Sequence, residues 1–136
     1  MRRRVLLTIM ALPWPVLADE LQTAIEAAIG ATRPEPGGIT LRAPERAENG
    51  GQVPITILVE SPQTAAEHVT AIHLFATRNP TPGVASFRLT PALARAEVQT
   101  RIRLAEDQRI LVLAQMSDGR VRQVAAEIRV ASGGCV

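Results

Sequence analysis

The sequence of 136 residues contains no lysine and no tyrosine, a single cysteine and very few aromatic side chains (2%). Because every strongly basic side chain is an arginine, Schiff-base chemistry and the phosphate-binding lysine of a P-loop are excluded. The lone Cys135 excludes a disulfide within the chain, and an unpaired thiol in an oxidising compartment is normally used or paired with another chain. The scarcity of aromatic residues requires a core built from Val, Ile, Leu and Ala.

The N-terminus has the pattern of a secretory signal peptide. Three arginines follow Met1, an apolar run covers residues 5–12, and small residues precede Asp19. We expect residues 1–18 to be a signal peptide that is cut after Ala18, because the apolar run is too short to span a bilayer. The first two arginines loosely match a twin-arginine signal, so the twin-arginine and Sec routes of export both stay open.

The expected mature chain has the length of one domain and a nearly balanced charge. Removing residues 1–18 leaves 136 − 18 = 118 residues, which is enough for a single core. Fifteen basic residues less the three in the signal peptide leave 12 against 13 acidic residues, a net charge of −1. This balance gives no reason to expect binding to nucleic acid or to a membrane surface.

Residues 19–38 are expected to form a short helix and a connector. Apolar residues repeat at helical spacing from Leu21 to Ile29, and Gly30 ends the pattern. Prolines and glycines then fill residues 32–38, which is typical of a connector. We expect the helix to lie against the body of the domain.

From residue 39 onward, apolar residues alternate with a period of two, which is typical of half-buried strands. Proline, glycine and asparagine separate these stretches, and no helix pattern lies between them. Seven short strands are expected, at residues 39–41, 53–59, 69–77, 85–89, 95–104, 110–116 and 122–130. The sequence therefore predicts an all-β domain over residues 39–130, an immunoglobulin-like antiparallel β-sandwich of about seven strands.

Neither the histidines nor the arginines of the strands form a recognisable reaction centre. A zinc site needs three or four converging ligands, whereas His68 and His73 are the only histidines and alternate toward opposite faces of a strand. We therefore expect no metal. Arg95, Arg101 and Arg103 share the outward face of a strand with a glutamate, which predicts a charge-mixed solvated face rather than a site for an anion or a partner.

The last six residues, 131–136, place the only cysteine behind two glycines. Gly133 and Gly134 lack a Cβ and leave the backbone free, and the five residues from Val130 to Cys135 extend at most roughly 16 to 18 Å. We expect a flexible arm that presents this thiol outside the domain. Because the neighbouring residues supply no base, cation or helix terminus, the thiol is interpreted as an attachment point rather than a catalyst. A frayed end with a chance cysteine is the alternative on spacing alone.

A set of stretches, spread in order along the expected mature chain, points to a known family. The stretches are Arg46–Ile55, Ile72–Ala76, Asn79–Phe87, Thr100–Ala105, Met116–Gly119 and Gly133–Cys135. Together they resemble the SoxY family, the substrate carriers of the periplasmic sulfur-oxidising system. The resemblance covers nearly all of the chain after residue 18.

The resemblance implies a non-catalytic periplasmic protein without a cofactor of its own, whose Cys135 holds thiosulfate-derived intermediates covalently. Gly133 and Gly134 would then keep the arm slim and mobile. The resemblance also implies a heterodimer with SoxZ, a second small sandwich protein. Three further partners are implied: SoxXA, a haem enzyme that couples thiosulfate to the carrier sulfur; SoxB, a hydrolase that releases sulfate; and, where present, SoxCD, which oxidises the remaining sulfane.

The chain departs from the SoxY pattern beside the cysteine. Family tails continue with one or two glycines, whereas here Val136 follows the cysteine, and Ser132 replaces a usually apolar residue. Valine is stiffer and wider than glycine, and the terminal carboxylate beside the sulfur repels anionic thiosulfate. Either the partner enzymes accept a wider arm, or the protein is a divergent or impaired carrier.

Two other interpretations stand beside the carrier. A periplasmic interaction protein with the same fold would use the thiol only for an intermolecular disulfide. A thiol oxidoreductase would need a resolving cysteine, which this chain lacks.

Overall fold

The computed structural model describes residues 16–131, with side chains from Glu20 onward. It begins with helix α1, Val16–Ile29. The helix is confirmed, and it begins three residues before its expected start at Asp19, within the segment assigned to the signal peptide. The strands that follow are β1 (Glu35–Pro36), β2 (Ile39–Arg42), β3 (Arg46–Ala47), β4 (Val53–Val59), β5 (Val69–Ala76), β6 (Gly83–Arg88), β7 (Ala96–Ile102), β8 (Gln108–Met116) and β9 (Val121–Val130).

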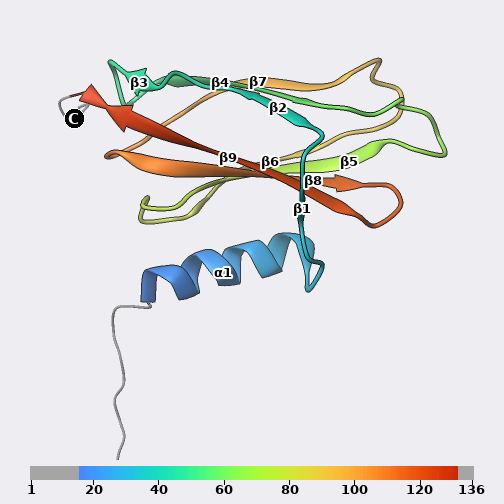
Figure 1. Ribbon diagram of the computed structural model, residues 1–136, viewed down its shortest axis with the longest axis horizontal. Helices are drawn as coiled ribbons and strands as arrows, with labels where there is room; N and C mark the ends of the chain where they lie inside the picture. Colours follow the sequence, from blue (N-terminus) through green and yellow to red (C-terminus); the bar gives the residue numbers. More distant parts are fainter. Residues whose placement is uncertain (1–15, 132–136) are drawn as a thin grey trace, which may run out of the picture.

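The strands form two sheets that pack face to face, as the two layers of Figure 1 show. The larger sheet has the order β1-β9-β8-β5-β6, and β3 also pairs with β9, while the smaller sheet has the order β2-β4-β7. The ladders between β2, β4 and β7 and between β9, β8, β5 and β6 are all antiparallel. The predicted β-sandwich is confirmed.

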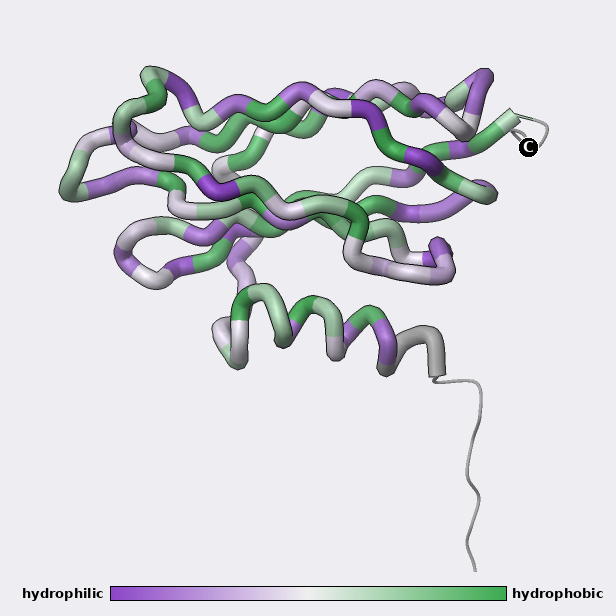
Figure 2. The backbone as a smooth tube through the Cα atoms, turned by 180° about the vertical axis from the view of Figure 1, so that it is seen from behind, coloured by the Kyte–Doolittle hydropathy of each residue, from purple (hydrophilic) through white to green (hydrophobic). Residues whose placement is uncertain are grey.

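Aliphatic residues on the inner faces of both sheets form the main core. Along β4 every second residue is buried, and β7 repeats this pattern except at the half-buried Thr100. Figure 2 shows the same alternation of hydrophobic and hydrophilic residues along the strands. Each fully buried side chain of this size contributes about 1.5 to 3 kcal/mol. The largest of them in the core are Ile55, Ile57, Ile72, Leu74, Leu104, Ile110 and Ile128.

Helix α1 covers the outer face of the larger sheet (Figure 1). Ile29 at the end of the helix packs with Phe75, Leu113 and Val121 of the sheet, and half-buried apolar residues of the helix surround them. Strand β5 is therefore buried on both faces. The alternation in the sequence separates the side chains of this strand into two faces. The second face is as buried as the first because helix α1 covers it.

Two short strands, β1 and β3, were expected to be irregular and instead pair with β9. Both pairings are parallel, Glu35 with Arg122 and Arg46 with Arg129. These two bridges add to the predicted antiparallel sandwich of about seven strands, and the sequence does not reveal them because two residues are too few to produce an alternating pattern. No helix within residues 16–131 is long and apolar enough to cross a membrane.

Candidate functional site

The predicted arm residues Gly133, Gly134 and Cys135 lie outside the described residues. The structure instead describes the point from which they continue, the end of β9 and the residue after it. We call Arg129–Ala131 the arm root. How firmly the arm root is held decides whether a thiol beyond it is presented from a fixed point.

The arm root is paired on both sides. On one side β9 runs antiparallel to β8, with Ile128 opposite Gln108. On the other side β3 pairs with it in parallel, so that Ala47 lies opposite Val130. Ala47 is buried in the main core, and Val130 packs against that core. The end of the last strand is therefore paired on both sides.

Two hydrogen bonds close the ladder at the arm root. The Arg129 N–H donates to the Glu45 carbonyl oxygen at 2.9 Å. The Val130 N–H donates to Asp107 Oδ1 at 2.7 Å, although Asp107 belongs to the turn before β8. A carboxylate that accepts a backbone N–H makes one of the stronger hydrogen bonds in proteins. The chain therefore leaves the body from a backbone that is fixed by its neighbours.

The surface beside the arm root carries charges of both signs. Glu45, Arg46, Glu127 and Arg129 line a hollow of about 580 Å³. The side chain of Glu127 is engaged by Arg109, whose Nη2 lies 3.0 Å from Glu127 Oε2. Both partners are exposed, so this pair contributes little to stability. Two arginines balanced by two glutamates give the hollow no strong preference for an anion or a cation.

The two histidines lie apart and have separate hydrogen-bond partners. His68 Nδ1 lies 3.0 Å from the carbonyl oxygen of Thr64. His73 is buried, with 8% of its surface exposed, and it bonds to Ser86 and Gln115. Among the described side chains, no three His, Cys, Asp or Glu residues are placed to hold a metal ion.

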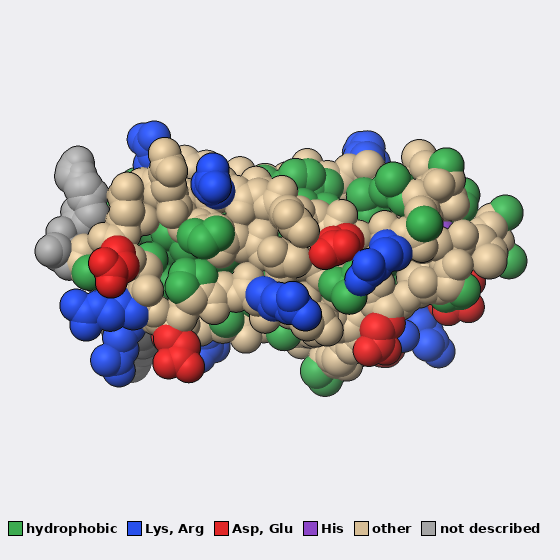
Figure 3. Space-filling view, turned by 90° about the horizontal axis from the view of Figure 1, so that it is seen from above, with side chains coloured by type: hydrophobic (Ala, Val, Ile, Leu, Met, Phe, Trp, Pro, Cys, Tyr) green, Lys and Arg blue, Asp and Glu red, His purple; other side chains and the backbone are tan. Residues whose placement is uncertain are grey.

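The arginines of the fifth expected strand lie on a mixed surface. Arg101 and Arg103 are exposed, and Arg95 Nε approaches Glu97 Oε1 at 4.0 Å. In the space-filling view onto the smaller sheet, basic and acidic side chains are interspersed (Figure 3). The prediction of a charge-mixed solvated face agrees with this surface.

The sequence gives the arm but not the contacts that hold its root. Nothing in the sequence indicates that β3 lies beside β9. From the sequence alone, Asp107 is recognised only as part of a polar turn. An acidic residue directly before a strand is only a weak indication that its side chain accepts a hydrogen bond from the backbone of another strand, a contact that we call a backbone clamp. Its partner becomes visible only when β8 and β9 are placed side by side.

The sequence matches the family described as sulfur oxidation protein SoxY over residues 25–135, a range that includes Cys135. No curated protein matches the chain. Among solved structures, the sulfur carrier protein SoxY from Chlorobium limicola f thiosulfatophilum is 33% identical, with a TM-score of 0.71. The match covers 85% of this chain and 99% of that one.

More distant structures share only the fold. A superoxide reductase (neelaredoxin) from Ignicoccus hospitalis is 17% identical, with a TM-score of 0.61 and coverage of 69% of this chain and 80% of its own. A putative superoxide reductase from Thermotoga maritima is 18% identical, with a TM-score of 0.61 and coverage of 74% and 89%. At this identity the sandwich is shared and the chemistry is not implied. The sequence match, which covers every strand of the sandwich and reaches the cysteine, and the SoxY structure together show that the chain belongs to the SoxY family.

Proposed function

We propose that the protein is a covalent carrier in sulfur oxidation, which holds thiosulfate-derived sulfur on Cys135 while other enzymes act on it. The observation that carries this proposal is the family match through residue 135, which includes the Gly133-Gly134-Cys135 sequence. It is supported by the likeness to a solved SoxY, which its title describes as a sulfur carrier protein. The protein itself supplies no catalyst in this scheme.

The proposed loading step is an oxidation. The thiolate of Cys135 and thiosulfate lose two electrons to a haem partner of the SoxXA type and form a sulfur–sulfur bond: R–S⁻ + S₂O₃²⁻ gives R–S–S–SO₃⁻ + 2 e⁻. A hydrolase of the SoxB type then adds water: R–S–S–SO₃⁻ + H₂O gives R–S–S⁻ + SO₄²⁻ + 2 H⁺. The remaining sulfane stays on the carrier for a dehydrogenase of the SoxCD type. Only the cysteine sulfur of this chain takes part.

The value of such a carrier is that it keeps a reactive sulfur species attached between enzymes. A tether converts each encounter into a local one and raises the effective concentration of the substrate. The fixed arm root suits this use, because Val130 and its neighbours hold the starting point of the arm while the sulfur lies up to roughly 16 to 18 Å further on. A partner enzyme then has to accommodate the arm and not the sandwich.

The proposal includes a periplasmic location, to which residues 1–18 direct the protein as a signal peptide through the twin-arginine or Sec route. It also includes a heterodimer with a SoxZ-type subunit. The N-terminal arginines and apolar run support export. The family match supports the subunit partner.

Intact mass spectrometry of protein isolated from cells that oxidise thiosulfate tests this proposal. We expect a ladder of species heavier than the free thiol by sulfane and thiosulfonate groups, reversed by a reductant. The matched control is Cys135→Ser, which keeps the size of the side chain and removes the nucleophile, and it should show none of these species.

Two results would count against the carrier. Wild-type protein that contains only free thiol or a symmetric disulfide dimer would favour the interaction protein instead. Sulfur adducts that persist in Cys135→Ser would place the attachment elsewhere.

A further inference from the structure

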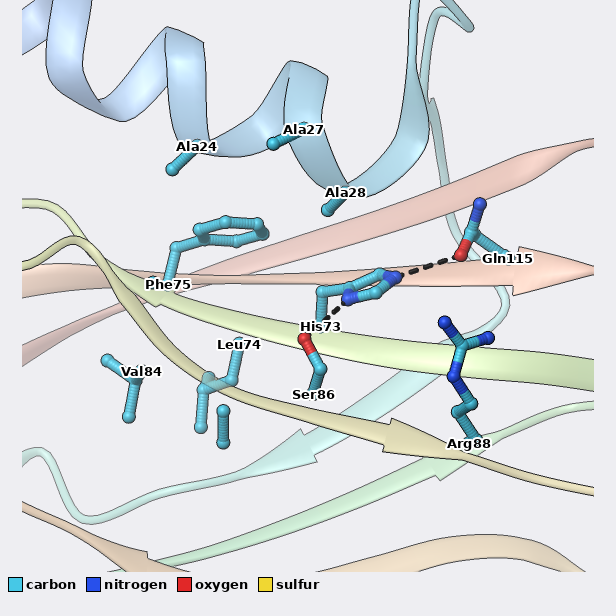
Figure 4. Close-up of a pocket in the computed structure, with 12 residues that line it drawn as sticks. Ala24, Ala27, Ala28, His73, Leu74, Phe75, Val84, Ser86, Arg88 and Gln115 are labelled. Atoms are coloured by element: carbon cyan, nitrogen blue, oxygen red, sulfur yellow. Dashed lines mark hydrogen bonds between the residues drawn. The ribbon is translucent and has the colours of Figure 1, made fainter.

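Strand β6 is an edge of the larger sheet. The order β1-β9-β8-β5-β6 places it at the end of the path, next to β5 alone. At the opposite end, β1 pairs with residues 122–123 of β9 and β3 pairs with residues 129–130. An uncovered edge has unpaired N–H and C=O groups and is a template for another strand. Figure 4 shows a pocket beside β6 with the residues that line it.

The register shows which backbone groups of β6 point outward. The Leu89 N–H donates to the Thr70 carbonyl oxygen at 3.0 Å, and Ile72 lies opposite Phe87 two residues further along. In an antiparallel ladder, bonded and non-bonded pairs alternate. Ser86 and Arg88 therefore occupy the non-bonded positions, and their N–H and C=O groups point away from β5. No hydrogen bond within the described residues uses these groups.

The side chains on the helix-facing side of β6 line a shallow groove of about 520 Å³ between α1 and the sheet (Figure 4). The helix contributes the small residues Ala24, Ala27 and Ala28, and the sheet contributes both polar and apolar residues, among them Ser86 and Phe75. Small side chains on the helix leave room beside the edge. A strand that continued the sheet would place every second side chain at this groove.

A hydrogen-bonded row fixes the floor of the groove. Ser86 Oγ lies 2.7 Å from His73 Nδ1, and His73 Nε2 lies 2.8 Å from Gln115 Oε1. Because an amide oxygen only accepts, Nε2 of His73 donates to Gln115 Oε1. The row holds β6 to β5 and β8, so the edge is a firm surface.

Among the described residues that line the groove, Arg88 is the only one with a formal charge other than the histidine. It is exposed, and none of the described carboxylates lies within 4.0 Å of it. On the opposite face, Phe87 of β6 and Leu89 directly after this strand are only partly buried and pack against the main core. Leu93, in the following loop, is a large hydrophobic residue with 42% of its surface exposed. The edge thus combines unpaired backbone groups, apolar surface and one unpaired positive charge.

We propose that β6 is the docking edge for a strand of the partner subunit, which extends the larger sheet and places an acidic side chain against Arg88. This inference rests on the proposed function for the existence of a partner and adds the surface it uses. Charge complementarity requires a carboxylate of the partner strand opposite Arg88. The side chains of the partner strand beside α1 are expected to be apolar or small. The arm root lies on β9, separated from β6 by β8 and β5, so docking leaves it uncovered.

Proline substitutions at outward-facing N–H groups test the proposal. Arg88→Pro removes an outward donor and the charge without breaking the ladder with β5, and Arg88→Ala removes the charge alone. The matched control is Gln99→Pro on β7, the edge of the smaller sheet, where the ladder alternation also points the N–H outward. The full chain is bound to the co-expressed SoxZ-type subunit, and thermal melts of each variant verify folding.

We expect Arg88→Pro to weaken the complex by at least about tenfold, Arg88→Ala by a smaller factor, and Gln99→Pro by less than about twofold. Hydrogen exchange of the wild-type complex gives a second readout: the Ser86 amide should become protected on binding and the Gln99 amide should not. The second readout holds even if Arg88→Pro fails to fold.

An unchanged affinity for folded Arg88→Pro, or a Ser86 amide that exchanges as fast in the complex as in the free protein, would overturn the docking edge alone. Failure of the wild-type chain to bind the subunit would overturn both the partner and its docking edge. Sulfur loading of Cys135 is measured independently, so the carrier function is tested separately from the docking edge.

Discussion

At the scale of single residues, Gly38 combines a positive φ angle with a close contact, which the other glycines compared below do not. Its φ angle is +78°, a backbone conformation that strongly favours glycine. A Cβ at this position would lie 2.5 Å from Nη1 of Arg122. The Gly38 carbonyl oxygen also accepts the Glu60 N–H at 2.9 Å. The connector after α1 is therefore held between the side chain of Arg122 on β9 and the end of β4.

Replacing this glycine tests how firmly the connector is held. Gly38→Ala forces a Cβ into a left-handed conformation, which costs about 1 to 2 kcal/mol, and it also displaces the Arg122 guanidinium. We expect a loss of about 2 to 3 kcal/mol in the free energy of unfolding, measured by urea denaturation. In the double variant with Arg122→Ala, the steric part should disappear and the backbone part remain.

Two other glycines provide controls for the separate parts of this effect. Gly119 has a φ angle of +92° and open space around its Cβ, so Gly119→Ala should lose only the backbone part. Gly83 has open space without a positive φ angle, and Gly83→Ala should be close to neutral. Equal losses at Gly38 and Gly83 would contradict this explanation.

At the scale of elements, the alternation of apolar and polar residues predicts the strands that have one buried and one solvent-exposed face. β4 and β7 follow it closely because their outer faces meet solvent. β5 is buried on both faces because α1 covers it, and β1 and β3 depend on β9, which lies far along the chain. Local patterns cannot encode such contacts.

The candidate site divides in the same way. Cys135 and its glycines are recognised from residue types and order alone, without any knowledge of neighbours. The clamp on Val130 requires the placement of Asp107 beside the end of β9, which depends on the β8–β9 register. The thiol is thus a property of the sequence, and its fixed starting point is a property of the fold.

The clamp on the arm root leads to a local prediction. Asp107→Ala removes the acceptor for the Val130 N–H, and we expect a loss of about 1 kcal/mol in stability. Hydrogen exchange at the Val130 amide should become faster, while amides in the middle of β9 keep their protection. Mass spectrometry of the exchanging protein measures both.

Asp107→Asn is the matched control, because the side-chain oxygen remains available as an acceptor. It should retain most of the protection at Val130. If Asp107→Ala left the exchange at Val130 unchanged, the pairing with Ala47 on β3 would be sufficient to hold the arm root, and the carboxylate would have no part in it.

At the scale of the whole molecule, the stability of the sandwich and the chemistry of the thiol are expected to separate. The two buried clusters lie within the sheets and under α1, and the last residue that packs against the main core as part of a strand is Val130. A change beyond residue 131 should then alter sulfur loading without altering folding. The two valines at residues 130 and 136 allow the same substitution on either side of this division.

Val136→Gly places a small residue after the cysteine, as the resemblance to SoxY tails leads us to expect. We expect its free energy of unfolding to stay within about 0.5 kcal/mol of wild type. Loading of Cys135 by thiosulfate with the proposed haem partner should become faster or stay equal, because a stiff side chain beside the sulfur is removed. Val130→Gly removes a side chain packed against the core and should lose about 2 kcal/mol. A clear drop in melting temperature for Val136→Gly would mean that this residue packs on the body, and the division between holder and arm would then be wrong.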